Sequence, residues 1–491
     1  MLLGAVNLGM RGVSVVSTIV LARILEPSDF GLVAMALILL QTSSLFSGLG
    51  MRQALVQTKL PVHIAASHAI VVTSFAGLFF SSLVFLNAQW FAVLLGNQGV
   101  APMLQWMSPI IFIQSISLVP EALLQRELQF VRMSLAMIIP ELPYVGVAIG
   151  LAFLGFGAWS LVYASLVRVV VRGVLQVFMC ADRGWLIPKD LNRATFILLL
   201  RFGMQTTGSG LVSFFNSIMD NLIVGRFLGV QALGYYSKAY DFSTHTVDGF
   251  NRVISGVLFP SYSKIQDDRD RLLRAYLKTL SIISLVTVPA CLGLCILAPE
   301  IIGTLFGTKW LPMVTAFRIL CIMCLVRSLS ATTSPLFLSL GKPHLDLRAG
   351  TLVLVIMVGL MFSLLTWGID GIAMAMLISQ TIGFVYNLSQ VHQIFSGAAW
   401  RMIVVLRPSI LSGLAMVTGI FIVRMALQSV LHDALILLIV LVAIGAMVFL
   451  GMIQLVQRSL LAEMRDLVRS ALARKKPATI PETSEQNTQH V

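Results

Sequence analysis

Five ionisable side chains recur along one short stretch of an otherwise apolar chain. Residues 236–252 read YSKAYDFSTHTVDGFNR. The ionisable residues follow one another at steps of 3, 4, 3 and 4: Lys238, Asp241, His245, Asp248 and Arg252. On a helix, such steps place all five side chains on one face. Basic groups bind anions, whereas carboxylates and imidazole exchange protons, so this face could do both.

The composition places this face inside a membrane. The chain has 491 residues, of which 57% are hydrophobic and 11% charged, and its mean hydropathy is +0.91. An ordinary soluble domain carries about 25% charged residues. Apolar runs of about 20 residues, the length that crosses a bilayer as a helix, recur along the chain. The sequence therefore predicts an all-α polytopic membrane protein with about 14 transmembrane helices.

The basic residues set the predicted orientation. The net charge is +13, but most Lys and Arg residues, including Arg52, Arg168 and Arg172, fall in or next to segments on one side of the predicted membrane. Such an asymmetry marks the cytoplasmic side. It predicts that both termini are cytoplasmic, and it argues against nucleic acid as a partner.

An internal repeat organises the chain. At a constant offset of 203 residues, Arg23 matches Arg226 and Gly31 matches Gly234. Each unit contains six predicted helices, an even number, so both units enter the membrane in the same direction, as a parallel pseudo-twofold repeat. The predicted parts are a six-helix lobe at 1–180, a cytoplasmic linker at 181–193, a six-helix lobe at 194–395, two extra helices at 396–457, a basic amphipathic cytoplasmic helix at 458–476 and a disordered tail at 477–491.

Further ionisable residues lie within predicted spans. They are Arg11, Glu141, Asp220 and Arg327. Burying such groups in hydrocarbon is costly, so they usually face a partner or a water-filled cavity. The repeat pairs the first two spans with the seventh and eighth, so we expect their polar faces to meet across the pseudo-twofold axis. For single residues a structural ion pair is an open alternative, whereas five aligned groups exceed what one pair needs.

The sequence offers no enzyme or metal signature. His245 has no HxxxH partner, and the CIMC at 321–324 lacks a second ligand pair. Neither a GxxxxGK[ST] phosphate loop nor a GxSxG motif occurs. We therefore predict no catalytic residues, no metal and no cofactor, and a transporter here would run on an ion or substrate gradient.

Several segments resemble one family. LARILEPSDFGLVAMALILL, GLGMRQALVQ, GRFLGVQALGYYSKAY, LFPSYSKIQDD, LAPEIIGTLFGTKWLP and LSLGKP occur in order within residues 8–395. They resemble the bacterial polysaccharide transport family, the oligosaccharide-lipid flippases of the multidrug/oligosaccharidyl-lipid/polysaccharide exporter superfamily. The resemblance implies two lobes around a V-shaped cavity. It also implies transfer of undecaprenyl-pyrophosphate-linked oligosaccharides from the cytoplasmic to the periplasmic leaflet of the bacterial inner membrane, coupled to H⁺ or Na⁺ entry.

The resemblance and the physical pattern together suggest site residues. We expect the pyrophosphate and sugars to be bound by Arg11, Arg252, Arg327 and Lys238. We expect ion coupling or gating by Asp241, Asp248, His245, Glu141 and Asp220. Membrane lipids, and a polysaccharide polymerase or export complex, are further expected partners.

Three alternatives stay open at this stage. A multidrug or small-molecule cation antiporter of the same superfamily would need an acidic, aromatic pocket, and here the deepest basic groups outweigh the acids. A lipid-linked peptidoglycan precursor flippase is chemically close to the favoured function. A scaffold for a polymerase complex would not transport at all.

Overall fold

The computed structural model describes most of the chain. It covers residues 2–58, 60–180, 184–186, 191–427 and 433–456, and the side chains at 2–11, 186, 205, 206, 209 and 246–257 are outside that description. The predicted amphipathic helix at 458–476, the tail at 477–491 and most of the linker at 181–193 are also outside the described residues.

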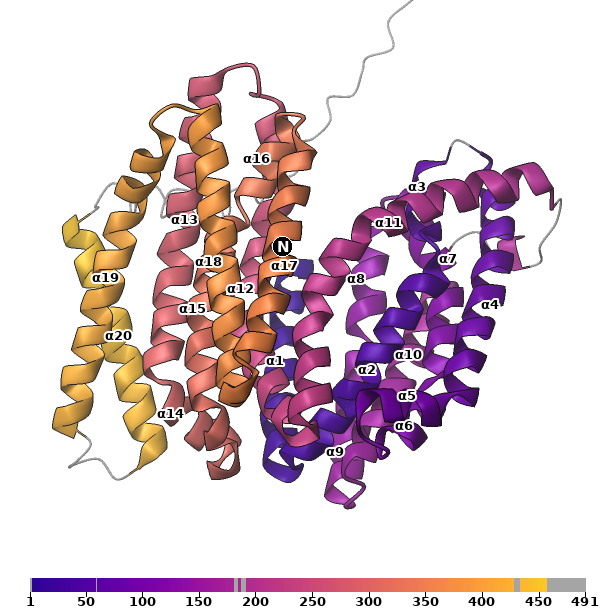
Figure 1. The fold of residues 1–491 in the computed structure, drawn as a ribbon, viewed down its shortest axis with the longest axis horizontal. Coiled ribbons are helices and arrows are strands. Elements are labelled where there is room, and N and C mark those ends of the chain that lie inside the picture. Colours follow the sequence, from indigo (N-terminus) through magenta and orange to yellow (C-terminus); the bar gives the residue numbers. More distant parts are fainter. Residues whose placement is uncertain (1, 59, 181–183, 187–190, 428–432, 457–491) are drawn as a thin grey trace, which may run out of the picture.

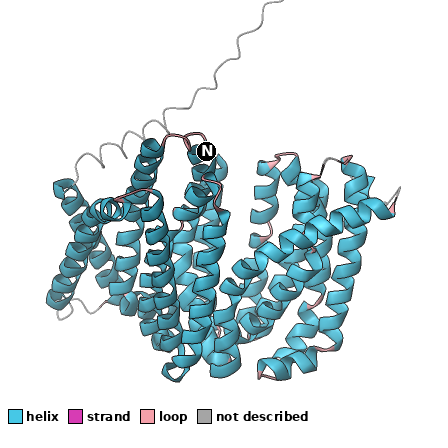
Figure 2. Cartoon of the chain, turned by 45° about the horizontal axis from the view of Figure 1, so that its top comes forward, coloured by secondary structure: helices cyan, strands magenta, loops and turns pink. Residues whose placement is uncertain are grey.

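Within the described residues the chain forms only helices and loops (Figure 2). The N-terminal part contains α1 (Leu2–Ile24), α2 (Pro27–Gly48), α3 (Met51–Gln57), α4 (Val62–Leu86), α5 (Ala88–Leu95), α6 (Val100–Met107), α7 (Pro109–Arg126), α8 (Phe130–Ile138), α9 (Glu141–Phe153) and α10 (Ala158–Met179). The short helix η1 (Gly184–Leu186) follows. Next come α11 (Arg193–Ile223), η2 (Val224–Leu228), α12 (Val230–Ser263), α13 (Arg269–Ile296), α14 (Ala298–Ile301), η3 (Ile302–Phe306), η4 (Thr308–Met313), α15 (Val314–Ser330), α16 (Thr333–Ser339), α17 (Pro343–Ser363), η5 (Leu365–Trp367) and α18 (Gly368–Ile394). The chain continues with α19 (Ala398–Leu427) and α20 (Ala434–Val456).

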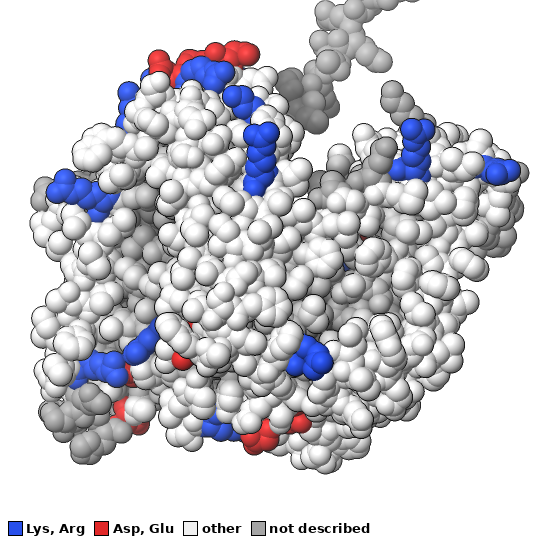
Figure 3. Space-filling model, in the orientation of Figure 1, with Lys and Arg blue, Asp and Glu red and all other residues white. Residues whose placement is uncertain are grey.

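The prediction of an all-α polytopic membrane protein is confirmed. Twelve helical segments of the described chain are long and apolar enough to cross a membrane. The helix α12 adds 34 residues that carry the charged stripe, and α1 adds 23. On the face drawn in Figure 3, Lys, Arg, Asp and Glu gather near two opposite rims, and the band between them is almost free of charge. Such a band suits contact with lipid.

The helices form two lobes (Figure 1). The N-lobe consists of α2–α10 with α1 packed on α8 and α9, and the C-lobe consists of α12–α18. Helix α11 begins against α3 of the N-lobe and ends against α17 of the C-lobe. The molecule is hollowed between the lobes at the end where α3 lies (Figure 3). The predicted orientation makes this open end cytoplasmic.

The lobes meet where α2 crosses α12. A Cβ atom added to Gly31 would lie 1.8 Å from the carbonyl oxygen of Val230, and one added to Gly234 would lie 1.8 Å from that of Pro27. Glycine permits such close helix approach because it has no side chain. Both pairs obey the 203-residue offset, Gly31 with Gly234 and Pro27 with Val230. The crossing is therefore symmetric about the pseudo-twofold axis that the repeat predicts.

Toward the closed end, the C-lobe receives the last turn of α1. Arg23 Nε donates a hydrogen bond to the carbonyl oxygen of Leu305 at 2.9 Å, and Arg23 Nη2 donates to the carbonyl oxygen of Thr304. These carbonyls belong to η3, at the start of the segment that leads into α15. The contact therefore joins the two lobes directly.

The C-lobe makes the reciprocal contact. Lys309 Nζ donates to the carbonyl oxygen of Leu25 at 2.7 Å and lies 3.4 Å from Glu26 Oε1. Trp310 Nε1 donates to the carbonyl oxygen of Ala22 at 2.9 Å. The last carbonyls of a helix lack helical partners and attract cations, so these donors suit the end of α1. We call residues 22–26 and 304–310 the closed-end seal.

One ion pair fastens the last two helices to the C-lobe. Helix α19 packs on α13 and α20. At its C-terminal end, Arg424 Nε lies 2.8 Å from Glu300 Oε1 of α14. The side chain of Glu300 is only 10% exposed, so its charge depends on this partner.

We expect Arg424→Ala to destabilise the folded protein by about 3 kcal/mol, because it leaves the carboxylate of Glu300 buried without its cation. Thermal unfolding of the detergent-purified protein measures this, and Arg424→Lys should lose less. The matched control is Arg407→Ala, which removes an exposed arginine of the same helix. Equal unfolding temperatures for Arg424→Ala and Arg407→Ala would contradict the prediction.

Candidate functional site

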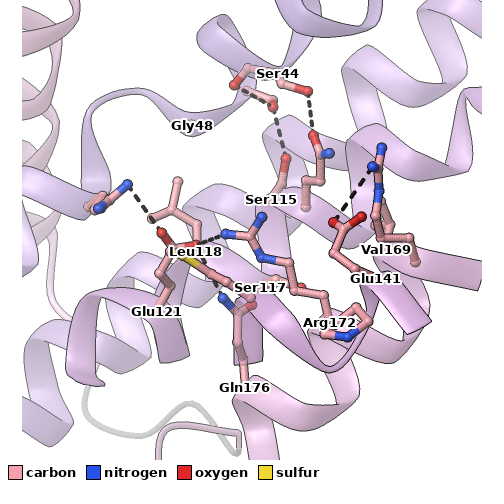
Figure 4. A pocket seen from close by; sticks show the side chains of 16 residues that line it. Ser44, Gly48, Ser115, Ser117, Leu118, Glu121, Glu141, Val169, Arg172 and Gln176 are labelled. Carbon is pink, nitrogen blue, oxygen red and sulfur yellow. Dashed lines mark hydrogen bonds and ion pairs between the residues drawn. The ribbon is translucent and has the colours of Figure 1, made fainter. Parts of the chain in front are cut away.

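The N-lobe forms a partly open polar chamber (Figure 4). Its volume is about 490 Å³, and helices α2, α3, α7, α8, α9 and α10 form its walls. We call it the N-lobe chamber. It is lined by Ser44, Ser47, Gly48, Arg52, Gln114, Ser115, Ser117, Leu118, Glu121, Met137, Pro140, Glu141, Arg168, Val169, Arg172 and Gln176.

One carboxylate organises the charges on one side of this chamber. Glu121 of α7 has Arg52 Nη1 at 3.2 Å from Oε1 and Arg172 Nη2 at 3.2 Å from Oε2. The amide of Gln176 also donates to Oε2, at 3.2 Å. Arg172 and Gln176 face Glu121 together because they lie one turn apart on α10. A single negative charge therefore serves two arginines.

A second ion pair lies on the other side. Arg168 Nη1 is 3.7 Å from Glu141 Oε1, and its guanidinium carbon lies 4.4 Å from the ring centre of Tyr144. Glu141 begins α9 directly after Pro140, where the helix started by α8 is interrupted. The chamber thus holds three arginines, Arg52 among them, and two glutamates, which leaves an excess of positive charge.

A smaller pocket lies between the lobes. Its volume is about 200 Å³, and we call it the interlobe pocket. It is lined by Phe30, Val33, Ala34, Leu37, Ile38, Gln41, Tyr144, Leu161, Ser165, Arg168, Ile218, Asn221, Ser237, Lys238 and Asp241. These residues come from α2, α9 and α10 of the N-lobe and from α11 and α12.

The two cavities adjoin each other. Arg168 lines both of them. Along α2, residues 30–41 line the interlobe pocket and residues 44–48 line the N-lobe chamber. The two cavities therefore lie side by side between the crossing of the lobes and the interior of the N-lobe, and α2 and α10 line both of them.

Two of the predicted residues face the interlobe pocket. Lys238 Nζ lies 3.3 Å from Asp241 Oδ2 and 4.7 Å from the ring centre of Phe30. The ammonium group therefore contacts α2 of the other lobe as well as its own helix. The carboxylate of Asp241 is 48% exposed, so solvent can reach the pair.

Two other predicted residues, Asp220 of α11 and Arg327 of α15, contact tyrosines of α12. Asp220 is 1% exposed, and the hydroxyl of Tyr236 donates a hydrogen bond to its Oδ2 at 3.0 Å. Arg327 Nη1 donates to the hydroxyl of Tyr240 at 2.8 Å. The rings of Tyr236 and Tyr240 stack with centres 6.3 Å apart. This tyrosine pair connects Asp220 with Arg327. Neither Asp220 nor Arg327 lines the interlobe pocket or the N-lobe chamber.

The remaining predicted residues are placed less fully. His245 is an exposed residue of α12. The side chains of Arg11, Asp248 and Arg252 lie outside the described structure, so their proposed roles stay predictions. Glu141 lies in the N-lobe chamber, separated from the stripe on α12 by the interlobe pocket.

Sequence reasoning missed part of the chamber. Arg52, Arg168 and Arg172 were interpreted as cytoplasmic charges, and Glu121 was not singled out. A signal was present, since Ser165, Arg168, Arg172 and Gln176 follow at steps of 3, 4 and 4, the same kind of stripe as the one on α12. These arginines also fit the positive-inside pattern of the predicted cytoplasmic side, and that interpretation concealed the stripe.

Comparison with known proteins shows clear similarities. Residues 20–315 match the family model described as polysaccharide biosynthesis protein. The lipopolysaccharide biosynthesis protein WzxC of Escherichia coli (strain K12) is 25% identical over 340 residues, which cover 69% of this chain and 68% of that protein. The succinoglycan biosynthesis transport protein ExoT of Rhizobium meliloti (strain 1021) is 31% identical over 305 residues, or 62% of this chain and 60% of ExoT.

Among solved structures, the fold is similar to that of the lipid II flippase MurJ in an inward closed conformation. The TM-score is 0.77 at 18% sequence identity, over 94% of this chain and 99% of that one. At this identity the likeness concerns the fold alone. It extends through the last two helices of the chain, beyond the two lobes.

Proposed function

Because the chain belongs to the polysaccharide biosynthesis protein family, we propose that it moves lipid-linked oligosaccharides across the bacterial inner membrane. The observation that carries this proposal is the pair of adjoining cavities with excess positive charge, the interlobe pocket and the N-lobe chamber, inside an otherwise apolar multi-pass protein. We propose that together they form the cargo path. Relatives named as a transport protein of succinoglycan biosynthesis and as a probable glycan biosynthesis flippase support it. The protein acts as a transporter and not as an enzyme.

The path suits the chemistry of such a cargo. Undecaprenyl pyrophosphate carries negative charge, its sugars need hydrogen-bond partners, and its polyprenyl tail remains in lipid. Cationic side chains lower the cost of bringing an anion into the membrane. Lys238 meets the cargo in the interlobe pocket, and Arg11, Arg252 and Arg327 assist with the pyrophosphate.

Transport requires the path to open alternately at each end. In the described state the lobes are apart at the predicted cytoplasmic end and joined at the closed-end seal. Cargo enters from the cytoplasmic leaflet, the lobes rotate about the crossing at Gly31 and Gly234, and the seal opens to the periplasm. Both termini remain cytoplasmic.

The ion that drives this cycle is H⁺ or Na⁺, exchanged at carboxylates of the path and the C-lobe. Asp220 is the best-placed group because it is buried and accepts a hydrogen bond from a neutral tyrosine hydroxyl. Asp241, Asp248, His245 and Glu141 gate access from the cavities. A membrane-buried carboxylate is costly to keep charged, so ion binding there favours one conformation over the other.

We expect Asp220→Asn to lower gradient-driven transport by about tenfold or more, because an amide cannot gain and lose a proton or balance a sodium ion. Transport down the substrate's own gradient should fall less. The measurement is flipping in proteoliposomes with and without an imposed H⁺ or Na⁺ gradient. Asp346→Asn, at an exposed site, is the control, and equal gradient dependence in both variants would show that Asp220 is not the coupling group.

The proposed function is tested with the full-length protein in liposomes. A lipid-linked oligosaccharide extracted from the source cells is supplied, and an impermeant lectin measures the fraction that has crossed. We expect wild-type protein to bring the oligosaccharide lipid of the inner leaflet to the outer leaflet, where the lectin binds it. Lys238→Ala should slow this transfer. A wild-type protein that flips no oligosaccharide would overturn the proposal.

The same assay separates the alternatives. A cation antiporter would transport organic cations instead, which the excess of arginine over glutamate in the N-lobe chamber disfavours. A peptidoglycan precursor flippase would prefer a peptide-bearing lipid substrate. A scaffold would flip none of these lipids while still assembling with a polysaccharide polymerase.

A further inference from the structure

We propose that the N-lobe chamber is a subsite for an acidic sugar of the transported glycan, whose carboxylate is bound by Arg172 and Arg52 in competition with Glu121. The inference deepens the proposed function and rests on it. It names a chemical class of cargo, a glycan that contains uronic acid or a similar carboxylated sugar, and a location for that sugar inside one lobe.

Glu121 itself shows that the arginines fit a carboxylate. Each of its oxygens lies 3.2 Å from a different guanidinium, that of Arg52 or that of Arg172, and Gln176 adds an amide donor. Arginine binds carboxylates through paired N–H groups of fixed geometry. A sugar carboxylate that reaches the same place would find the same donors.

The arginines have binding capacity beyond Glu121. A guanidinium carries five N–H donors, and Glu121 uses few of them. The side chains of Arg52 and Arg172 are 41% and 40% exposed, whereas that of Glu121 is 14% exposed. The guanidinium groups therefore border the open volume, and the carboxylate lies behind them. Arg168, at 34% exposed, adds a third cation on the way from the interlobe pocket.

The rest of the lining suits a sugar ring. Ser115 Oγ donates to Ser47 Oγ at 2.8 Å, and Ser44 Oγ donates to Gln114 Oε1 at 3.0 Å. Ser44 and Gln114 can exchange their mutual hydrogen bond for bonds to sugar hydroxyls, whereas Ser47 and Ser115 are buried. The volume of about 490 Å³ falls within the range of about 300–1,000 Å³ typical of small-molecule sites.

The position favours the sugar over the pyrophosphate. The pyrophosphate is joined to the polyprenyl tail and stays within reach of lipid. The sugars extend farthest from the tail. All residues that line the N-lobe chamber belong to one lobe, and the chamber adjoins the interlobe pocket at Arg168, which lines both. A substrate with its headgroup between the lobes would direct its sugars into this chamber.

Glu121 then has a defined role. In the empty protein it neutralises two arginines that would otherwise repel each other. When the acidic sugar arrives, its carboxylate takes the place of Glu121 in the ion pairs with the two arginines, and Glu121 returns when the sugar leaves. Removing the charge of Glu121 should therefore strengthen binding of an acidic glycan and slow its release.

The test uses full-length protein in nanodiscs and three probes. They are an undecaprenyl-pyrophosphate-linked tetrasaccharide with one glucuronate, the same lipid with that sugar reduced to glucose, and undecaprenyl pyrophosphate alone. We expect wild-type protein to prefer the glucuronate lipid over its reduced form by about tenfold, as for one charge-assisted contact. Arg172→Gln should abolish the preference. Arg132→Gln, an exposed arginine of the same lobe, should keep it.

Glu121→Gln gives the decisive comparison. We expect it to bind the glucuronate lipid more tightly than wild type and the reduced lipid equally well. A merely structural cluster would instead lose stability in this variant without gaining affinity. Equal binding of the two glycans by wild type, or a preference unchanged in Arg172→Gln, overturns the inference. Tight binding of undecaprenyl pyrophosphate alone that Arg172→Gln weakens assigns the site to the headgroup and also overturns it.

Failure of the inference is distinguishable from failure of the proposed function. If the reduced glycan is flipped in liposomes as fast as the acidic one, the protein is a flippase without an acidic-sugar subsite. If neither glycan is flipped, the proposed function itself is wrong.

Discussion

We expect transport to stop when residues 26 and 309 are joined by a short thiol-reactive cross-linker, and to resume when the link is cleaved. The variant carries Glu26→Cys and Lys309→Cys, with the five native cysteines replaced by alanine. We expect flipping in proteoliposomes to fall below about 1% of the uncross-linked rate, because closure on one side then becomes permanent. A cleavable reagent allows the rate to be measured before, during and after the link.

The physical reason lies in the closed-end seal. Lys309 belongs to the C-lobe and Glu26 to the N-lobe, and their charged atoms are 3.4 Å apart. Opening the periplasmic end requires these residues to separate. A covalent bridge prevents that motion even though every group of the cargo path is unchanged.

The control is a cross-link within one lobe. Ser334 Oγ donates to Asp346 Oδ2 at 3.1 Å, and both residues belong to the C-lobe. Ser334→Cys combined with Asp346→Cys should be bridged by the same reagent and still transport. If the bridge between residues 26 and 309 leaves flipping unchanged, the seal does not open during transport.

The sequence was sufficient to predict the helices and the symmetry of the fold. Long apolar runs specify membrane helices without knowledge of their neighbours. The 203-residue offset paired Gly31 with Gly234, and these two glycines meet where α2 crosses α12. The same symmetry brought α12 against α2, so that Lys238 and Asp241 face the interlobe pocket.

The N-lobe chamber could not be predicted from the sequence, because its charged residues meet only in the tertiary structure. Glu121 is a single acidic residue near the end of α7, and its arginine partners lie on α3 and α10. Arginine near a helix end is also the usual mark of the cytoplasmic side, so position alone does not separate the two roles. Only the packing of α7 against α3 and α10 reveals that these arginines share a carboxylate.

The closed-end seal was also beyond sequence reasoning. Arg23 and Lys309 donate mainly to backbone carbonyls of the opposite lobe. Every residue has a backbone carbonyl, so such partners leave no mark in the sequence. The internal repeat draws attention to Arg23, because it aligns with Arg226, but the repeat does not indicate what either residue contacts.

Replacing either glycine of the α2–α12 crossing, Gly31 or Gly234, by alanine is expected to lower the free energy of unfolding by about 2–3 kcal/mol, as for an overpacked interior site. The added Cβ of Gly31→Ala or Gly234→Ala would lie 1.8 Å from a backbone oxygen of the opposite helix. Backbone cannot rotate away as a side chain can, so α2 and α12 must separate. We expect a lower unfolding temperature in detergent and slower flipping, since the lobes lose their close contact at the crossing.

The two substitutions act on one crossing, so their effects should not add. Once Gly31→Ala has moved the helices apart, the added Cβ of Gly234→Ala meets a wider gap. The double variant should therefore lose less stability than the sum of the losses in the two single variants. The control is Gly359→Ala in α17, where an added Cβ meets nothing within 4 Å. For Gly359→Ala we expect the free energy of unfolding to rise by up to about 1 kcal/mol, because alanine has a higher helix propensity than glycine. If Gly31→Ala and Gly359→Ala unfold at the same temperature, close approach at the axis is not what holds the lobes together.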